Sequence, residues 1–217
     1  MDIAKNIPGP RTIERVRPIA MMVIAGVLYF AVIIVALHFL RPDLDPISRP
    51  TSEYAVGRYG FLMSTAFFSM SLAAFILVVG LYQGITLAAR SLIGLVFLGL
   101  WGIGVLIAMI FPMDAEGALP TLSGMIHQVA APFTFLSVTL GISLVSRRLK
   151  LDDQWRPFYR PALFLSPIVW LGFAGTFLSF ITQSGFMGLA QRITLATIVT
   201  WMLLAAFRLR SVAARRS

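Results

Sequence analysis

Six apolar stretches constrain this chain more than any other feature of its sequence. They cover about residues 18–40, 60–86, 91–112, 123–146, 161–182 and 186–207. About 20 apolar residues suffice to cross the roughly 30 Å hydrocarbon core of a bilayer. In that core the backbone must satisfy its own hydrogen bonds, so each stretch must be a helix or part of a closed barrel. The stretches lack the alternation of barrel strands, and we therefore predict an all-α integral membrane protein with six transmembrane helices.

Composition and length favour a single membrane domain over residues 1–217. Of the 217 residues, 58% are hydrophobic and 12% are charged, whereas a soluble domain carries about a quarter charged residues. The longest predicted connection, residues 41–59, is too short to hold a separate soluble domain. The chain has no cysteine, which excludes disulfides, thiolate metal sites, iron–sulfur clusters and cysteine nucleophiles.

The basic residues are divided unequally between the two sides of the predicted bundle. Fourteen of the 18 lie in the two termini or in the connections that follow the second and fourth stretches. The other side holds four: Arg41, Arg49, Arg58 and Arg192. The positive-inside rule then places both termini in the cytoplasm of a multi-pass protein, which we expect in a bacterial inner (plasma) membrane. The net charge of +9 thus indicates orientation and contact with anionic lipid, and we expect no nucleic-acid partner.

Polar and ionisable side chains gather at the opposite, extracytoplasmic end. The group contains both histidines and most of the acidic residues outside the termini: His38, Arg41, Asp43, Asp45, Arg49, Ser52, Glu53, Tyr54, Arg58, Tyr59, Asp114, Glu116, His127, Gln128, Gln191 and Arg192. Ionisable groups are costly inside a membrane bundle, so their position is the best available indication of function. We therefore predict a polar pocket at this end.

The connection 41–59 is predicted to be ordered. Its second half reads as a short helix that begins at a proline and ends at a glycine, as those residues favour. Such a helix, lying over the bundle, would place Glu53 and Tyr54 near Asp114 and Arg192. The alternative is a solvated loop whose charges satisfy one another.

Two side chains inside the predicted helices each leave two interpretations open. His127 is followed by Pro132, whose missing N–H leaves the carbonyl of Gln128 unpaired, and the two groups would make a polar pocket floor. Alternatively, His127 makes a structural hydrogen bond to another helix. Arg192, about one turn inside the last stretch, must find either an acidic partner, Glu53 or Asp114, or a lipid phosphate.

The known reaction classes receive little support from these residues. A nucleophilic hydrolase could combine Ser52 and His127 with Asp114 or Glu53, but the sequence has no Gly-x-Ser-x-Gly elbow. A hydrolytic zinc site would want more histidines than two, and a transporter would want ionisable residues at mid-membrane. We predict no metal and no cofactor. The alternative of a b-type haem would use His38 and His127 as its two axial ligands.

Several short motifs together resemble a known family. They lie at residues 41–46, 52–55, 57–63, 111–114, 124–127 and 188–192. The chain resembles, over about residues 18–207, a bacterial family of small polytopic membrane proteins known as a domain of unknown function. That family is similar in architecture to the DRAM-like and FGF-receptor-activating-protein-like six-helix membrane proteins. The resemblance implies a six-helix bundle with a polar extracytoplasmic end and, at second hand, a role in membrane-lipid handling.

The leading hypothesis is a pocket that binds or processes a lipid head group or a related amphiphile. As catalytic candidates we take His127, Glu53 and Asp114, and as ligand-binding candidates Arg192, Arg58, Tyr54, His38 and Gln191. In this hypothesis the two arginines hold an anionic group, His127 and Glu53 act as hydrogen-bond partners or as acid and base, and Asp114 orients His127. The alternative is a non-catalytic accessory subunit. The expected partners are membrane lipid and either another membrane protein or a second copy of the chain.

Overall fold

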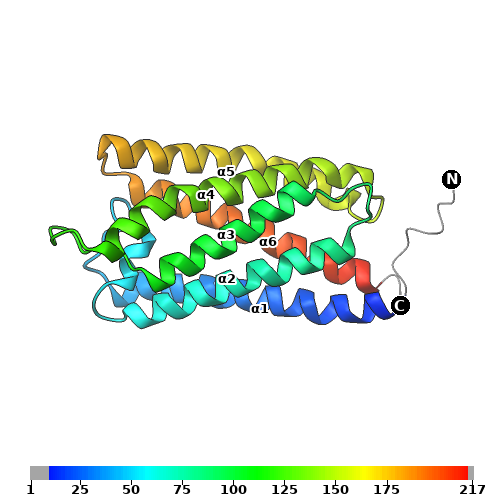
Figure 1. Cartoon of the computed structure of the whole chain (residues 1–217), viewed down its shortest axis with the longest axis horizontal. Helices are drawn as coiled ribbons and strands as arrows, with labels where there is room; N and C mark the ends of the chain where they lie inside the picture. The colour runs from blue at the N-terminus through cyan, green and yellow to red at the C-terminus, as the bar shows by residue number, and fades with distance from the viewer. Residues whose placement is uncertain (1–9, 215–217) are drawn as a thin grey trace.

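The structure, a computed structural model, describes residues 10–214 and consists of six long helices joined by short connections (Figure 1). The helices are α1 (Pro10–Leu40), α2 (Gly60–Gly84), α3 (Leu92–Ile110), α4 (Leu122–Arg148), α5 (Arg156–Thr182) and α6 (Met187–Ala214). Two 3-10 helices, η2 (Thr51–Ala55) and η3 (Leu149–Leu151), lie in the connections. Residues 10–214 contain no strand, so the all-α prediction is confirmed.

The six helices form a ring in chain order. Each helix packs on the next, and α6 closes the ring by packing on α1. The start of α1 and the end of α6 lie at the same end of the bundle, which we call the termini end (Figure 1). The far end, opposite to it, carries the connections 41–59, 111–121 and 183–186.

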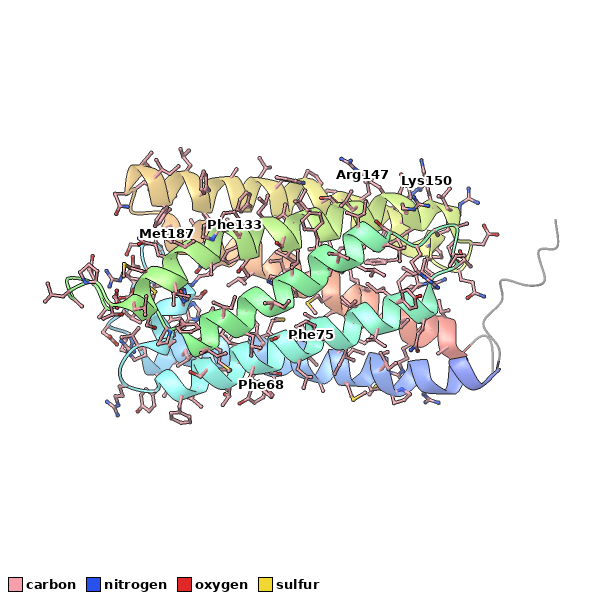
Figure 2. The ribbon with its side chains drawn as sticks, viewed as in Figure 1. Phe68, Phe75, Phe133, Arg147, Lys150 and Met187 are labelled. Carbon is pink, nitrogen blue, oxygen red and sulfur yellow. The ribbon has the colours of Figure 1, made fainter. Side chains whose placement is uncertain are left out.

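The outer surface of the bundle suits lipid rather than water. All six helices have the length and apolar composition of a membrane span. Large apolar side chains project from their outward faces, among them Phe68 on α2 and Phe133 on α4, each more than half exposed (Figure 2). The basic side chains of Arg147 and Lys150 lie at the termini end, where they are exposed. The fold is therefore that of a polytopic membrane protein.

Each predicted apolar stretch either lies within its helix or extends no more than two residues beyond the helix end. Three helices extend five or more residues beyond the stretches at the termini end: α1 begins at Pro10, α5 begins at Arg156 and α6 ends at Ala214. Charged residues end an apolar stretch without ending a helix, because long basic side chains reach the head-group region from a helix that leaves the membrane. Lys5, Arg215 and Arg216, which contribute to the predicted orientation, lie outside the described residues.

Small residues spaced four apart allow close helix packing in this bundle. On α2, a methyl group added at Gly80 or Gly84 would collide with the side chain of Leu209 on α6. On α3, a methyl group at Gly104 would collide with Thr134 on α4. Such close approach matters in a bilayer, where lipid provides no hydrophobic drive for helices to associate.

Buried polar contacts close the termini end. The indole N–H of Trp155 donates to the carbonyl oxygen of Gly84 at 2.9 Å, and this ring is fully buried. The carboxylate of Asp152, also buried, accepts the backbone N–H of Thr86 at 2.9 Å. These contacts join the connection after α2 to the connection after α4, so the helices are held together at this end.

Candidate functional site

The connection 41–59, which we call the strap, folds across the far end and is anchored by Arg192 of α6. Nη1 of Arg192 donates to the carbonyl oxygens of Pro46 at 2.8 Å and Arg49 at 2.7 Å. A guanidinium group offers five N–H donors in a fixed plane, so a single side chain satisfies several loop carbonyls at once. The prediction that Arg192 pairs with Glu53 or Asp114 is wrong, because its hydrogen-bond partners are backbone oxygens, His38 and Tyr54.

His38 and Tyr54 complete the environment of Arg192. Nε of Arg192 donates to Nε2 of His38 at 2.9 Å, and Nη2 lies 3.2 Å from the hydroxyl of Tyr54. Nδ1 of His38 lies 2.6 Å from the carbonyl oxygen of Ile34. Since a carbonyl only accepts, Nδ1 carries the proton and Nε2 accepts from Arg192. Both ring nitrogens of His38 are thus already engaged.

A second anchor fixes η2 within the strap. Oε1 of Gln191 accepts the backbone N–H of Thr51 at 2.6 Å and its hydroxyl at 2.8 Å. The residues from Thr51 to Tyr54 are buried, so the strap carries the predicted short helix and is not a solvated loop. Gly188 permits this docking, because a methyl group there would collide with the carbonyl oxygen of Arg49.

Arg41 ties the start of the strap to its end. Its Nε and Nη2 bind the carboxylate of Asp43, at 2.9 Å and 2.8 Å, and its Nη1 donates to the carbonyl oxygens of Val56 and Arg58. The hydrogen bond from Arg41 lowers the pKa of Asp43 below its usual value. The strap is therefore closed on itself by one guanidinium group.

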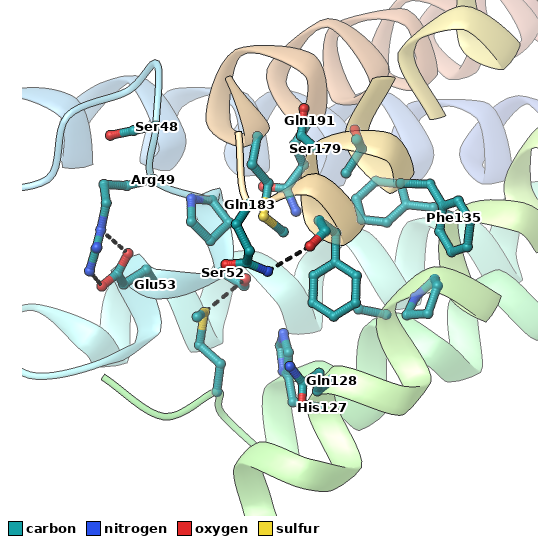
Figure 3. Close-up of a pocket in the computed structure, with 18 of the residues that line it drawn as sticks. Ser48, Arg49, Ser52, Glu53, His127, Gln128, Phe135, Ser179, Gln183 and Gln191 are labelled. Carbon is teal, nitrogen blue, oxygen red and sulfur yellow. Dashed lines mark hydrogen bonds and ion pairs between the residues drawn. The ribbon is translucent and has the colours of Figure 1, made fainter. Parts of the chain in front are cut away.

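Beneath the strap lies a pocket of about 770 Å³. Its walls come from the strap, the connection 111–121, α4, α5 and the start of α6 (Figure 3). The lining residues are Ser48, Arg49, Pro50, Ser52, Glu53, Met113, Asp114, Glu116, Gly124, His127, Gln128, Ala131, Pro132, Phe135, Phe173, Thr176, Phe177, Ser179, Phe180, Gln183, Ser184, Gly185, Met187 and Gln191. A volume of this size is typical of small-molecule sites.

The pocket occupies the space where α4 and α5 diverge. Toward the termini end the two helices are joined by a hydrogen bond of 3.0 Å from the indole N–H of Trp170 to the hydroxyl of Ser143. Toward the far end they separate (Figure 1), and pocket residues line both facing surfaces. Phe135 and Phe173 line the pocket furthest along their helices from the far end. The pocket therefore runs from polar residues at the far end of the bundle, which we call its mouth, to aromatic residues nearer the middle of the bundle, which we call its interior.

Charges concentrate at the mouth. The guanidinium of Arg49 donates from Nε to Oε2 of Glu53 at 2.7 Å (Figure 3). Its Nη atoms pair with Glu53 and Glu116. Glu53 is buried, whereas the side chain of Glu116 is largely exposed. This ion pair joins the strap to the connection 111–121 and so forms part of the pocket roof.

Asp114 lines the pocket but does not orient His127. Its carboxylate accepts the hydroxyl of Thr121 at 2.6 Å and the backbone N–H of Thr121 at 3.0 Å. These hydrogen bonds lower the pKa of Asp114 below its usual value. The predicted orienting role is therefore wrong: Asp114 organises the chain just before α4, whose N-cap is Thr121.

His127 projects from α4 into the pocket (Figure 3). Its Nδ1 lies 2.9 Å from the carbonyl oxygen of Phe111 at the end of α3, so Nδ1 donates and Nε2 is left as an acceptor. Within residues 10–214, Nε2 has no hydrogen-bond partner, although only 6% of the residue is exposed. The structural hydrogen bond to another helix is thus confirmed, and one ring nitrogen remains for a ligand.

The structure brings together four of the eight candidate residues at the pocket: Glu53, Asp114, His127 and Gln191. Three of the others, Arg192, His38 and Tyr54, form the adjacent anchor of the strap. Arg58 lies apart, exposed, with its guanidinium 4.6 Å from the centre of the Tyr59 ring. Arg192 and Arg58 therefore do not hold an anionic group in this pocket.

A haem bound between His38 and His127 does not fit this arrangement. His38 does not line the pocket, and axial ligation would break its bond to Arg192. Within the described residues 10–214, no cluster of three or more histidine and acidic side chains is suited to hold a metal ion.

Sequence reasoning missed several pocket residues. The most important are the aromatic side chains of α5: Phe173, Phe177 and Phe180. Their spacing of four and three residues places them on one helix face, which was a usable indication of a lined cavity. Gln183, at the end of α5, was also missed, and its side-chain N–H donates to the carbonyl oxygen of Phe180 at 2.6 Å.

The fold and site define a class: a six-helix integral membrane protein with a pocket at the end opposite its termini. Residues 23–208 match the family described as protein of unknown function (DUF998). The chain belongs to that family, because the match covers most of its length. The resemblance inferred from the sequence motifs, to a family of unknown function, is thereby confirmed.

Comparison with curated proteins found no match. Comparison with solved structures likewise found no match.

Proposed function

We propose that this protein binds an amphiphile, such as a membrane lipid, with its head group at the mouth of the pocket and its chain in the aromatic interior. The observation that carries the proposal is the polarity gradient along the pocket. Charged and amide side chains line the mouth, and Phe135, Phe173 and Phe177 line the part nearer mid-membrane. A lipid in one leaflet has the same gradient in the same direction, so it can enter without exposing its chain to water.

The divergence of α4 and α5 supports access from the bilayer. Val129 and Phe177 are exposed on the two helices at the level of the pocket, so lipid chains contact the bundle at this height. Such an entrance spares the ligand a passage through water, which is costly for apolar chains.

The side of the membrane on which we propose that the pocket lies follows from the distribution of basic residues. Fourteen of the 18 basic residues belong to the side of the termini. By the positive-inside rule the termini are cytoplasmic, and the pocket faces the extracytoplasmic leaflet of a bacterial inner membrane. The lipids of that leaflet are then the source of the ligand.

The test is to measure amphiphiles that stay bound after gentle extraction. The full chain is purified in a mild detergent, and retained lipids are identified and quantified by mass spectrometry. The Ala131→Phe variant fills the pocket, because Ala131 lines it. Ala174→Phe is the matched control: Ala174 lies on the exposed face of α5 and is not a lining residue.

We expect a lipid to co-purify in about molar equivalence with the wild type and the Ala174→Phe control, and several-fold less with Ala131→Phe. Equal retention by all three proteins would show that the lipid lies elsewhere on the surface. A wild type that retains nothing, and that binds no lipid added in vesicles, would overturn the proposal.

A further inference from the structure

The charge at the pocket mouth bears on which head group fits. Four lining residues carry charge: one guanidinium, Arg49, and three carboxylates, Glu53, Asp114 and Glu116, which give a formal net charge of −2. The negative charge of this mouth would repel an anionic ligand. A cationic group would be attracted, and the attraction is stronger near a low-dielectric bundle than in bulk water.

Arg49 is not available to offset this charge for an incoming anion. Its Nε and Nη2 bind Glu53 and its Nη1 binds Glu116. Glu53 is 4% exposed, so releasing it from Arg49 would leave a buried, unpaired carboxylate. Among the described residues, Arg49 is the one guanidinium that lines this pocket, and it is committed to the protein itself.

Two side chains of the pocket, His127 and Gln183, offer hydrogen-bond acceptors that have no partner among the described residues. Nε2 of His127 is an acceptor because Nδ1 donates to Phe111. Gln183 uses its amide N–H toward Phe180 and leaves its oxygen free within the described residues. Gln191 is the opposite case: its oxygen is occupied by Thr51, so its N–H groups remain for a ligand oxygen.

Taken with the proposed function, on which this inference rests, we propose that the head group recognised is ammonium-bearing. A primary ammonium supplies three N–H donors and a positive charge, which match the acceptors and the net charge of the mouth. The ammonium lies among His127, Gln183 and the carboxylates. The N–H groups of Gln191 bind an oxygen of the linking phosphodiester.

The test compares three phospholipids with identical acyl chains. The purified full chain is placed in nanodiscs of phosphatidylcholine, and either phosphatidylethanolamine or phosphatidylglycerol is titrated in as a fluorescent analogue. The choline lipid serves as both matrix and competitor. Choline keeps the positive charge but has no N–H donor, and glycerol offers hydroxyl donors without positive charge.

Two variants separate the pocket charge from general electrostatics. Glu116→Gln removes one carboxylate from the mouth, and the high exposure of this side chain lets the fold tolerate the change. Asp153→Asn removes another exposed carboxylate, at the termini end, and is the matched control. We expect the ethanolamine lipid to bind best in the wild type. Glu116→Gln should narrow its preference over the glycerol lipid about two- to five-fold, as is typical for an exposed charge, while Asp153→Asn leaves the preference unchanged.

Each other outcome contradicts a stated claim. A preference for phosphatidylglycerol, or equal binding of all three head groups, would overturn the ammonium assignment and leave the amphiphile pocket standing. Binding of choline lipid as strong as that of ethanolamine lipid would overturn the role of the N–H donors. Failure of every phospholipid to bind, together with a lipid-free preparation, would overturn the proposed function itself.

Discussion

Arg192 shows how one side chain organises the polar end of this bundle. Its donors are divided among carbonyl oxygens of the strap, the ring of His38 and the hydroxyl of Tyr54. Removing such a donor leaves the part-buried acceptors among these groups, the carbonyl oxygen of Arg49 and the ring of His38, without partners, and each unsatisfied buried group costs about 1–3 kcal/mol. The residue therefore determines where the strap lies, and through it the roof of the pocket.

This leads to a prediction for Arg192→Lys. Lysine keeps the charge but lacks the planar fork, so it cannot serve the strap carbonyls and His38 together. We expect the free energy of unfolding in detergent to fall by about 2–3 kcal/mol, measured by denaturant titration. The control is Arg156→Lys, since that side chain is 73% exposed and its nearest acidic partner, Asp153, is 4.0 Å away. Equal losses in the two variants would contradict the anchoring role.

A second prediction concerns the pH dependence that Asp114 contributes. Hydrogen bonds from Thr121 lower its pKa in the folded protein from the ordinary 3.8. A carboxyl whose folded pKa is depressed stabilises the fold above pH 3.8, and this contribution disappears as the pH falls through the folded value. The wild type should therefore lose more stability than Asp114→Asn between pH 5 and about pH 3.

Melting temperatures in the same detergent, read across that pH range, check this prediction. Asp43 and Asp45 also have lowered pKa values, but they are common to both proteins and cancel in the comparison. Parallel pH profiles for the wild type and Asp114→Asn would show that the Thr121 contacts add no pH-dependent stability.

The sequence identified which polar residues gather at the far end, but not how they pair. Glu53, Asp114, His127 and Gln191 were expected at one pocket and line it. The partners of Arg192 could not be foreseen, because two of them are backbone oxygens of a loop whose path depends on the folded bundle. A sequence shows that an arginine has N–H donors that need partners, but it does not show which backbone carbonyls will face them.

Among the structural elements, α4 contributes most to the pocket. It supplies His127 and Gln128 at the mouth and Phe135 further in, and it runs through Pro132 without a break. Proline in a helix interior removes one backbone hydrogen bond and pushes its preceding turn outward, at a cost of about 3 kcal/mol. Because Pro132 lines the pocket, the helix turn that it weakens borders the site.

We therefore predict opposite effects of Pro132→Ala on stability and on binding. Alanine restores the hydrogen bond to the carbonyl of Gln128 and tightens the turn, which should stabilise the fold by about 1 kcal/mol. The same tightening displaces His127 and should reduce the retained amphiphile several-fold. Thermal unfolding and mass spectrometry of bound lipid measure the two quantities on one preparation.

Pro167→Ala is the matched control for this prediction. Pro167 lies inside α5 but does not line the pocket, so its replacement should stabilise the fold and leave lipid retention unchanged. Loss of lipid in both variants would mean that retention follows helix flexibility in general, and the specific role of Pro132 would be wrong.

The helices themselves were almost fully predictable, because the requirement to span a bilayer sets both their length and their composition. The polar end of the pocket was predictable from its side chains, but its aromatic part was not, since that part arises from the divergence of α4 and α5. The sequence pattern that best indicates the aromatic part of the pocket is on α5, where Phe173, Phe177 and Phe180 share one side of the helix. The same aromatic pattern is also typical of a packed core, and the position of α4 determines whether these side chains are packed or line a pocket.

At the scale of the whole molecule, the two ends differ in charge and in closure. The termini end holds most of the basic residues and is sealed by Trp155 and the carboxylate of Asp152. The far end holds the strap and the open pocket. If the pocket takes lipid from one leaflet, the orientation of the bundle decides which leaflet supplies it.

The orientation can be measured directly because the chain has no cysteine. A single cysteine is introduced at Leu119, which is 87% exposed at the far end, or at Asp153, whose side chain is 99% exposed at the termini end. We expect a membrane-impermeant maleimide to label Leu119→Cys in intact cells, and Asp153→Cys only after the membrane is permeabilised. The cysteine-free wild type gives the background. The reverse pattern would place the termini outside, so that the pocket would draw its ligand from the cytoplasmic leaflet. Labelling of both variants in intact cells, with no leakage of a cytoplasmic marker, would contradict a single fixed orientation.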